Sequence, residues 1–179
     1  MKKVIITIVS LFVIFNIKGY CQSLADLDRN PSFKGITIGA PISKYSDILH
    51  FSHVSNGKNV YKVTDSYYLS IFNERMQEMI VVESEGKVYA ILLSKTMPPD
   101  NNGYNIFNPN VILSWYSNLR SRYGNNSYSL DDMSGTPSVC GMRWKTSTVV
   151  LDIVYLFYGT AGNERPKLQY SLYQRKDDY

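Results

Sequence analysis

The stretch from residue 78 to residue 95 constrains the fold most, because it contains two apolar runs rich in β-branched residues, joined by Ser84-Glu85-Gly86-Lys87. This pattern is typical of a β-hairpin. Successive residues of a strand point to opposite faces, and neighbours such as Val81 and Val82 are both apolar. We therefore expect two central strands of a sheet, with other parts of the chain packed on both faces.

The N-terminus has the layout of a secretory signal peptide. Lys2 and Lys3 precede an apolar run over residues 4–17, which is short for a membrane span. The small residues Gly19 and Cys21 predict a signal peptide over residues 1–21. In the alternative interpretation, Cys21 is the lipid-bearing first residue of a lipoprotein. We predict an exported protein, whether periplasmic, outer-membrane-associated or secreted, with no transmembrane span after signal cleavage.

Removal of the signal changes the charge and cysteine arguments. The chain has 19 Lys and Arg against 15 Asp and Glu, and loss of Lys2, Lys3 and Lys18 leaves 16 against 15. No run of basic residues remains that could follow a phosphate backbone, so we predict no nucleic acid partner. Cys140 is the one cysteine left. We therefore expect no internal disulfide, and burial has to stabilise the fold.

Residues 22–32 are predicted to form a polar leader, and residues 33–96 a first structural unit. A helix is expected in this unit because its apolar residues form a stripe. The stretch after it is rich in Ser, Asn and Gly, which predicts a loop. Before the hairpin, the expected elements are strand Phe33–Ile38, helix Ile42–His50, loop Phe51–Asn59, and strands Val60–Val63 and Tyr67–Phe72.

Residues 97–108, which include Pro98 and Pro99, are predicted to form a linker loop before a second unit over residues 109–176. The second unit begins with the best-marked helix of the chain, with Asn108 as N-cap, Pro109 at the first position and Gly124 at the end. Three strands are expected after this helix: Val139–Lys145, Thr148–Tyr158 and Lys167–Gln174.

The order of a helix followed by a β-meander thus occurs twice along the chain. We predict an α+β fold in which each antiparallel meander is packed by a helix. The units can be arranged as two similar halves or as one continuous sheet, and the pattern leaves both arrangements open.

Few residues point to catalysis or metal binding. The mature chain offers Cys140, His50 and His53 for a nucleophilic site, but Cys140 lies within a predicted strand, where a small buried cysteine is the usual interpretation. His50 and His53 are interpreted as favourable charges at a helix end rather than as metal ligands. No pair of carboxylates is singled out for glycoside cleavage. We predict no catalytic residue, no metal site, no cofactor and no enzymatic activity.

Tyrosine is the one compositional excess, with 15 in the chain. A sheet face lined with tyrosine can contact protein or sugar, because the ring supplies area and the hydroxyl a hydrogen bond. Tyrosine is also simply a good strand residue. The apolar character of both strand faces favours a contact surface, since two predicted helices cannot cover both. The predicted binding residues are Tyr67, Tyr68, Tyr89, Tyr155 and Tyr158.

Residues 36–45, Ile-Thr-Ile-Gly-Ala-Pro-Ile-Ser-Lys-Tyr, resemble the opening of small exported bacterial domains in which a Gly-x-Pro/Thr turn launches a helix onto a β-meander. Residues 116–124 and Trp144 are similar to the second unit of such proteins. The groups concerned are the outer-membrane assembly lipoproteins of the SmpA/OmlA type and the secreted β-lactamase-inhibitory proteins. The resemblance implies a helix-plus-meander architecture and contact with other proteins. It implies no particular partner and no functional residue.

These observations favour an exported, non-catalytic binding module of the bacterial cell envelope. Its partner is expected to be an envelope protein or a glycan, bound through an aromatic, partly apolar sheet face. A small secreted enzyme or binding protein acting on glycan is the alternative. A homodimer that buries the second sheet face is a further possibility.

Overall fold

The computed structural model describes residues 23–98, 109–134, 137–158 and 165–175. The predicted signal peptide, most of the predicted linker and the N-cap Asn108 lie outside the described residues. Within the described ranges, no helix is long and apolar enough to cross a membrane.

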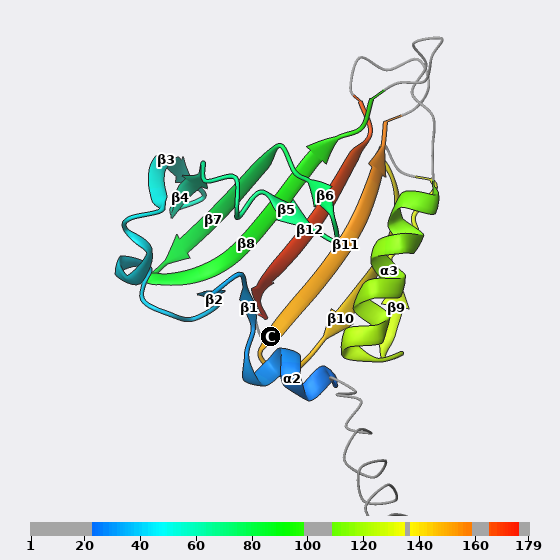
Figure 1. Ribbon diagram of the computed structural model, residues 1–179, viewed down its shortest axis with the longest axis horizontal. Coiled ribbons are helices and arrows are strands. Elements are labelled where there is room, and N and C mark those ends of the chain that lie inside the picture. Colours follow the sequence, from blue (N-terminus) through cyan, green and yellow to red (C-terminus); the bar gives the residue numbers. More distant parts are fainter. Residues whose placement is uncertain (1–22, 99–108, 135–136, 159–164, 176–179) are drawn as a thin grey trace, which may run out of the picture.

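One antiparallel sheet of eight strands dominates the described structure, in the order β3-β4-β7-β8-β12-β11-β10-β9 (Figure 1). The hairpin predicted from residue 78 to residue 95 is confirmed as β7 and β8, which hold the third and fourth places in the sheet. The strand bounds are β3 Leu49–Ser55, β4 Lys58–Val63, β7 Glu78–Ser84, β8 Lys87–Thr96, β9 Ser127–Ser129, β10 Ser138–Lys145, β11 Val149–Phe157 and β12 Lys167–Gln174.

A second layer covers one face of this sheet, which we call the core face. In Figure 1, helix α3 and the small hairpin β5–β6 lie in front of the sheet, with β1–β2 and α2 at its lower end. Side chains of this layer and of the sheet form one buried apolar cluster. The bounds are α2 Leu24–Arg29, β1 Ser32–Phe33, β2 Ile36–Thr37, β5 Ser70–Ile71, β6 Glu74–Arg75 and α3 Pro109–Tyr123.

Helix α3 has the limits predicted from the sequence. Its buried side chains recur at helical spacing and face the sheet: Ile112, Trp115, Leu119 and Tyr123. Gly124 ends the helix with a φ of 81°, a left-handed conformation that glycine adopts without strain, and its amide donates to the carbonyl of Arg120.

The predicted α+β class, with a helix on each meander, is wrong. The fold is dominated by one sheet, and the two predicted units share it because β8 pairs with β12. The predicted helix Ile42–His50 is a 3-10 turn over Ile42–Tyr45, and most of the predicted loop after it is strand β3. An apolar stripe of one helical turn does not outweigh the backbone pairing that a hairpin with β4 supplies.

The prediction that β7 and β8 are packed on both faces is also wrong. None of the described helices or small hairpins packs on the face opposite the core face, which we call the open face. Burial alternates accordingly, because Met79 and Val81 are fully buried whereas Ile80 and Val82 are only half-buried.

Four of the hairpin turns are two-residue turns with positive φ at both positions. They are Lys34-Gly35, Asn56-Gly57, Phe72-Asn73 and Glu85-Gly86. This type I′ geometry matches the twist of paired strands, and three of the turns place glycine second. Phe72 is the least favourable residue in these turns, because a left-handed backbone conformation (φ 47°) costs a bulky residue about 1–2 kcal/mol. Its ring meets Trp115 edge-on at 5.6 Å, which offsets about 0.5–1.5 kcal/mol of that cost.

The predicted polar leader is part of the fold. It contains α2, whose Leu27 is buried in the core cluster. Asp28 of the same helix holds the turn between β10 and β11, because its carboxylate accepts hydrogen bonds from the hydroxyls of Thr146, Ser147 and Thr148 and from the amide of Thr148. The sequence reasoning missed this contact because its partners are more than a hundred residues apart.

Candidate functional site

The five tyrosines predicted to bind a partner do not share one surface. Tyr155 is buried in the core with 1% of its surface exposed, and Tyr68 is half-buried against that core. Tyr67 is 61% exposed in the loop before β5, and Tyr158 is half-buried beside Lys167. Tyr89 lines the open face. The sequence showed an excess of tyrosine, but it could not show which rings face the core.

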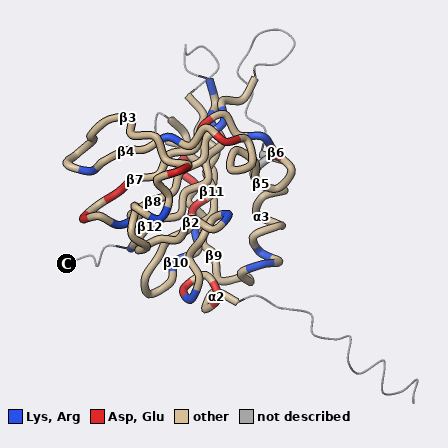
Figure 2. Tube along the Cα trace, turned by 60° about the vertical axis from the view of Figure 1, so that its left-hand side comes forward, with Lys and Arg blue, Asp and Glu red and all other residues tan. Residues whose placement is uncertain are grey.

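A β-bulge turns Tyr89 toward the open face. Val82 pairs with Ala90 and Glu83 pairs with Val88, so Tyr89 is the extra residue on β8. The side chain of Tyr89 therefore lies on the same face as Ala90, while Val88 returns to the core with no exposed surface. Lys58, at the tip of the β3–β4 hairpin where Figure 2 shows a basic residue, places its Nζ 4.8 Å from the centre of the Tyr89 ring.

A polar network spans the middle of the open face. Arg143 on β10 makes a bidentate ion pair with Asp152 on β11, at 2.6 Å and 2.7 Å. The Tyr173 hydroxyl on β12 donates to the same carboxylate at 3.0 Å, and Arg143 donates to that hydroxyl at 3.0 Å. Contact with Asp152 raises the pKa of Arg143, and burial raises the pKa of Tyr173. The network pairs the Asp152 carboxylate, which is only 6% exposed, with a guanidinium and a hydroxyl.

Next to this network the open face is shallowly hollowed and basic. A hollow of about 190 Å³ is lined by Tyr89, Arg143, Lys145, Val150, Tyr173, Gln174 and Arg175. Arg175 donates from Nη1 to the carbonyl of Thr146 at 3.0 Å. On β7 and β8, the open face carries half-buried apolar side chains: Ile80, Val82 and Leu92. The open face thus combines an apolar strip, two tyrosine rings and several cations.

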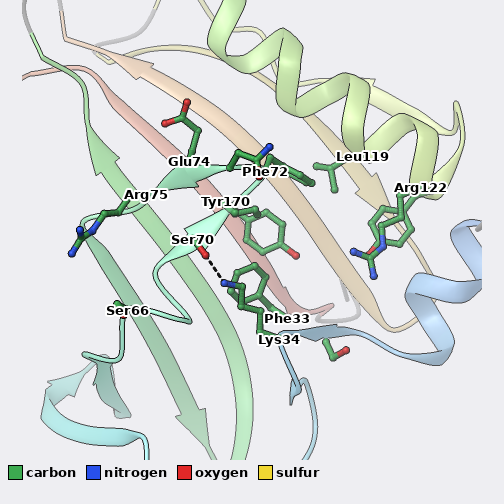
Figure 3. Close-up of a pocket in the computed structure, with 14 residues that line it drawn as sticks. Phe33, Lys34, Ser66, Ser70, Phe72, Glu74, Arg75, Leu119, Arg122 and Tyr170 are labelled. Carbon is green, nitrogen blue, oxygen red and sulfur yellow. Dashed lines mark hydrogen bonds between the residues drawn. The ribbon is translucent and has the colours of Figure 1, made fainter.

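A larger cavity than this hollow lies on the other side of the molecule, in the layer over the core face. This cleft has a volume of about 680 Å³ and opens between the β5–β6 hairpin, α3 and the turn between β1 and β2. Figure 3 shows Phe33 and Tyr170 at its floor, with Lys34 and Arg122 on different walls. Its remaining lining residues are Ser32, Ser66, Ser70, Ile71, Phe72, Asn73, Glu74, Arg75, Leu119 and Tyr123.

Lys34 is fixed at the edge of the cleft by the type I′ turn that it begins. Its Nζ donates to the Ser70 hydroxyl at 2.6 Å and to the carbonyl of Tyr67. The same ammonium lies 4.5 Å from the centre of the Tyr67 ring. Desolvation lowers the pKa of Lys34. A cation is therefore held over aromatic rings at the mouth of the cleft.

Cys140, the candidate nucleophile, does not have the environment of a reactive thiol. It is half-buried on β10, and burial followed by a hydrogen bond with Asp131 raises its pKa to about 11. A raised pKa favours the thiol over the thiolate that would attack a substrate. Nor do His50 and His53 lie at a helix end, because both are exposed on strand β3. Among the described residues, no three His, Cys, Asp or Glu side chains are grouped as metal ligands.

Comparison with known proteins gives no relative, since no family model, no curated protein and no solved structure matches this chain.

Sequence reasoning missed most of the residues that line the open face and the cleft, with Tyr89 as an exception. Nothing in the sequence placed Lys34, Arg122 and Tyr170 near one another. The Lys34-Gly35 dipeptide is a turn signal and could have marked a hairpin. Arg143 and Asp152 face each other only because β10 and β11 pair in the register that joins them.

Proposed function

We propose that this protein is an exported, non-catalytic binding module of the bacterial cell envelope, and that its open face docks onto an acidic surface of an envelope protein. The observation that carries the proposal is the composition of this face. Apolar side chains on β7 and β8 adjoin Tyr89 and Tyr173, and cations surround them.

Charge complementarity favours an acidic partner. The two acids described on this face are already paired, Asp152 with Arg143 and Glu78 with Lys62. Lys58 and Arg175 instead contact a ring and a backbone carbonyl. The face therefore carries an excess of positive charge. A partner with acidic residues gains from this excess and is steered toward it.

The same charge argues against a second copy of this chain on the open face. Two identical faces brought together by a twofold axis would place like charges opposite one another. The apolar strip favours a protein over a glycan, because half-buried Ile80, Val82 and Leu92 find matching apolar side chains only on a protein.

Binding is favoured over glycan hydrolysis by the content of the 680 Å³ cleft. A glycosidase uses two carboxyl groups. Among the described lining residues of the cleft, Glu74 is the one acid, and it is paired with Lys95 at 2.8 Å.

The test is capture from envelope extract of the source organism on the immobilised mature chain, followed by identification of the bound protein. We expect an acidic protein whose capture weakens with added salt and disappears with the double variant Lys58→Glu, Tyr89→Ser. Two controls on the other side of the molecule, Arg120→Glu and Tyr67→Ala, should retain it.

Capture that survives the double variant, or that is lost equally with Arg120→Glu, would contradict the proposal. Sedimentation of the isolated protein tests whether a second copy of the chain covers the open face instead. A dimer that Lys58→Glu disrupts would show that it does. Release of the captured material by a glycan-degrading treatment would favour the glycan interpretation.

A further inference from the structure

The cleft over the core face is separate from the open face and is not explained by docking of a partner there. Its volume of about 680 Å³ lies within the range of small-molecule sites. Its walls come from three segments far apart in the sequence, represented by Lys34, Glu74 and Arg122. Its floor is formed by Phe33 of β1 and Tyr170 of β12 (Figure 3).

Two tyrosines with little exposed surface line the cleft. Tyr170 is 4% exposed and Tyr123 is 7% exposed, and neither hydroxyl is among the buried side-chain atoms that lack a hydrogen-bond partner. In Figure 3 the Tyr170 ring extends into the cleft between Lys34 and Arg122. A tyrosine hydroxyl that lines an open cleft can donate a hydrogen bond to a ligand.

Cations stand on two sides of these hydroxyls. Arg122 packs over the Tyr123 ring, with its guanidinium carbon 5.4 Å from the ring centre. No ion pair is recorded for Arg122 or for Arg75 among the described residues. Lys34 stands on the opposite wall, bound to Ser70. The one acid in the lining, Glu74, is held by Lys95.

We propose that the cleft binds a small organic carboxylate carried on a ring, with the carboxylate bound by Arg122 and the hydroxyls of Tyr123 and Tyr170, and the ring packed on Phe33 and Tyr170 toward Lys34. A planar carboxylate accepts two parallel hydrogen bonds from a guanidinium, and it can also accept hydrogen bonds from tyrosine hydroxyls. Phe33 and Tyr170 already pack together, with their ring centres 5.4 Å apart, and supply an apolar floor.

Two kinds of molecule carry this chemistry, an acidic sugar and an aromatic acid. The probes are therefore glucuronate and 4-hydroxybenzoate, each titrated into the mature chain by isothermal calorimetry. Glucose and phenol, which have the rings without the carboxylate, serve as neutral controls. We expect one carboxylate probe to bind and its neutral counterpart to bind at least about tenfold more weakly, as loss of one charge-assisted contact predicts.

Matched variants locate the binding. Arg122→Gln should weaken the carboxylate probe about tenfold, and Tyr170→Phe, which removes only a hydroxyl, several-fold. Arg120→Gln on the same helix should leave binding unchanged, because Arg120 contacts Asn125 and the Tyr116 ring rather than the cleft. A melting curve for each variant shows that the fold is retained.

Binding of neither carboxylate, equal binding of the neutral controls, or an affinity unchanged by Arg122→Gln would each overturn the inference. Inorganic phosphate binding more tightly than both carboxylates would overturn the assignment of a planar anion. These outcomes are independent of the proposed function, because the capture experiment changes residues of the open face and this one changes residues of the cleft.

Discussion

The two faces of the sheet are built from the same strands but are stabilised in different ways. On the core face, Leu93 and Ile153 have no exposed surface and lie under a layer of helix and hairpins. On the open face, one ion pair and its tyrosine occupy the middle. Ala90 and Val150 beside them are buried, whereas Ile80, Val82 and Leu92 are half-buried. The comparison teaches that apolar strand composition alone does not determine which side of a sheet is packed.

The largest effect is expected from truncation on the core face. Leu93→Ala removes a side chain with no exposed surface and leaves a cavity in the main apolar cluster. Such changes lower the free energy of unfolding by about 2–5 kcal/mol. Urea denaturation measures the change, and a loss below about 1 kcal/mol would show that this face is less tightly packed than the structure indicates.

A somewhat smaller loss is expected from the polar network of the open face. Arg143→Met leaves Asp152 buried without its partner, which costs about 3 kcal/mol. The double variant Arg143→Met, Asp152→Leu removes both charges and should recover most of that loss. Lys62→Met, which breaks the exposed pair with Glu78, is the matched control and should cost less than about 1 kcal/mol. Equal losses for the two single variants would mean that the network does not hold the open face.

A third prediction concerns the polar contact between Asp28 of α2 and the turn between β10 and β11. Its hydrogen bonds with the three hydroxyls of the β10–β11 turn hold the pKa of its carboxyl well below the usual range. Asp28→Ala should lower the free energy of unfolding by about 2 kcal/mol at pH 7. Because the folded pKa is lowered, this stabilisation is present above the unfolded value of about 4 and is lost as the pH falls through the folded pKa.

Thermal unfolding of wild type and Asp28→Ala between pH 7 and pH 2 checks this prediction. The difference between the two proteins should be constant above about pH 5 and shrink at lower pH. A difference that grows on acidification would contradict the assigned direction of the shift.

How much could be predicted from the sequence depended on how local each signal was. The β7–β8 hairpin and α3 were predicted within a residue or two, because turn residues, a proline and a glycine mark their ends. Strand β3 was missed because its pairing with β4 outweighs the short apolar stripe before it. Tyr89 lies on the open face and Tyr155 in the core, and the sequence could not separate the two, since the face of each ring depends on the bulge and on pairing between distant strands.

The smallest expected effect comes from Leu92→Ala, and it sharpens the comparison most. Leu92 and Leu93 are neighbours on β8 with the same side chain, but one points to the open face and the other to the core. Truncation of Leu92 should cost about 1 kcal/mol or less, because a half-buried side chain loses less apolar contact and leaves no closed cavity. The same variant should weaken capture of the acidic partner, whereas Leu93→Ala, measured where it is still folded, should not. A large loss of stability with Leu92→Ala would mean that the open face is packed by the protein itself, and the docking proposal would then lose its surface.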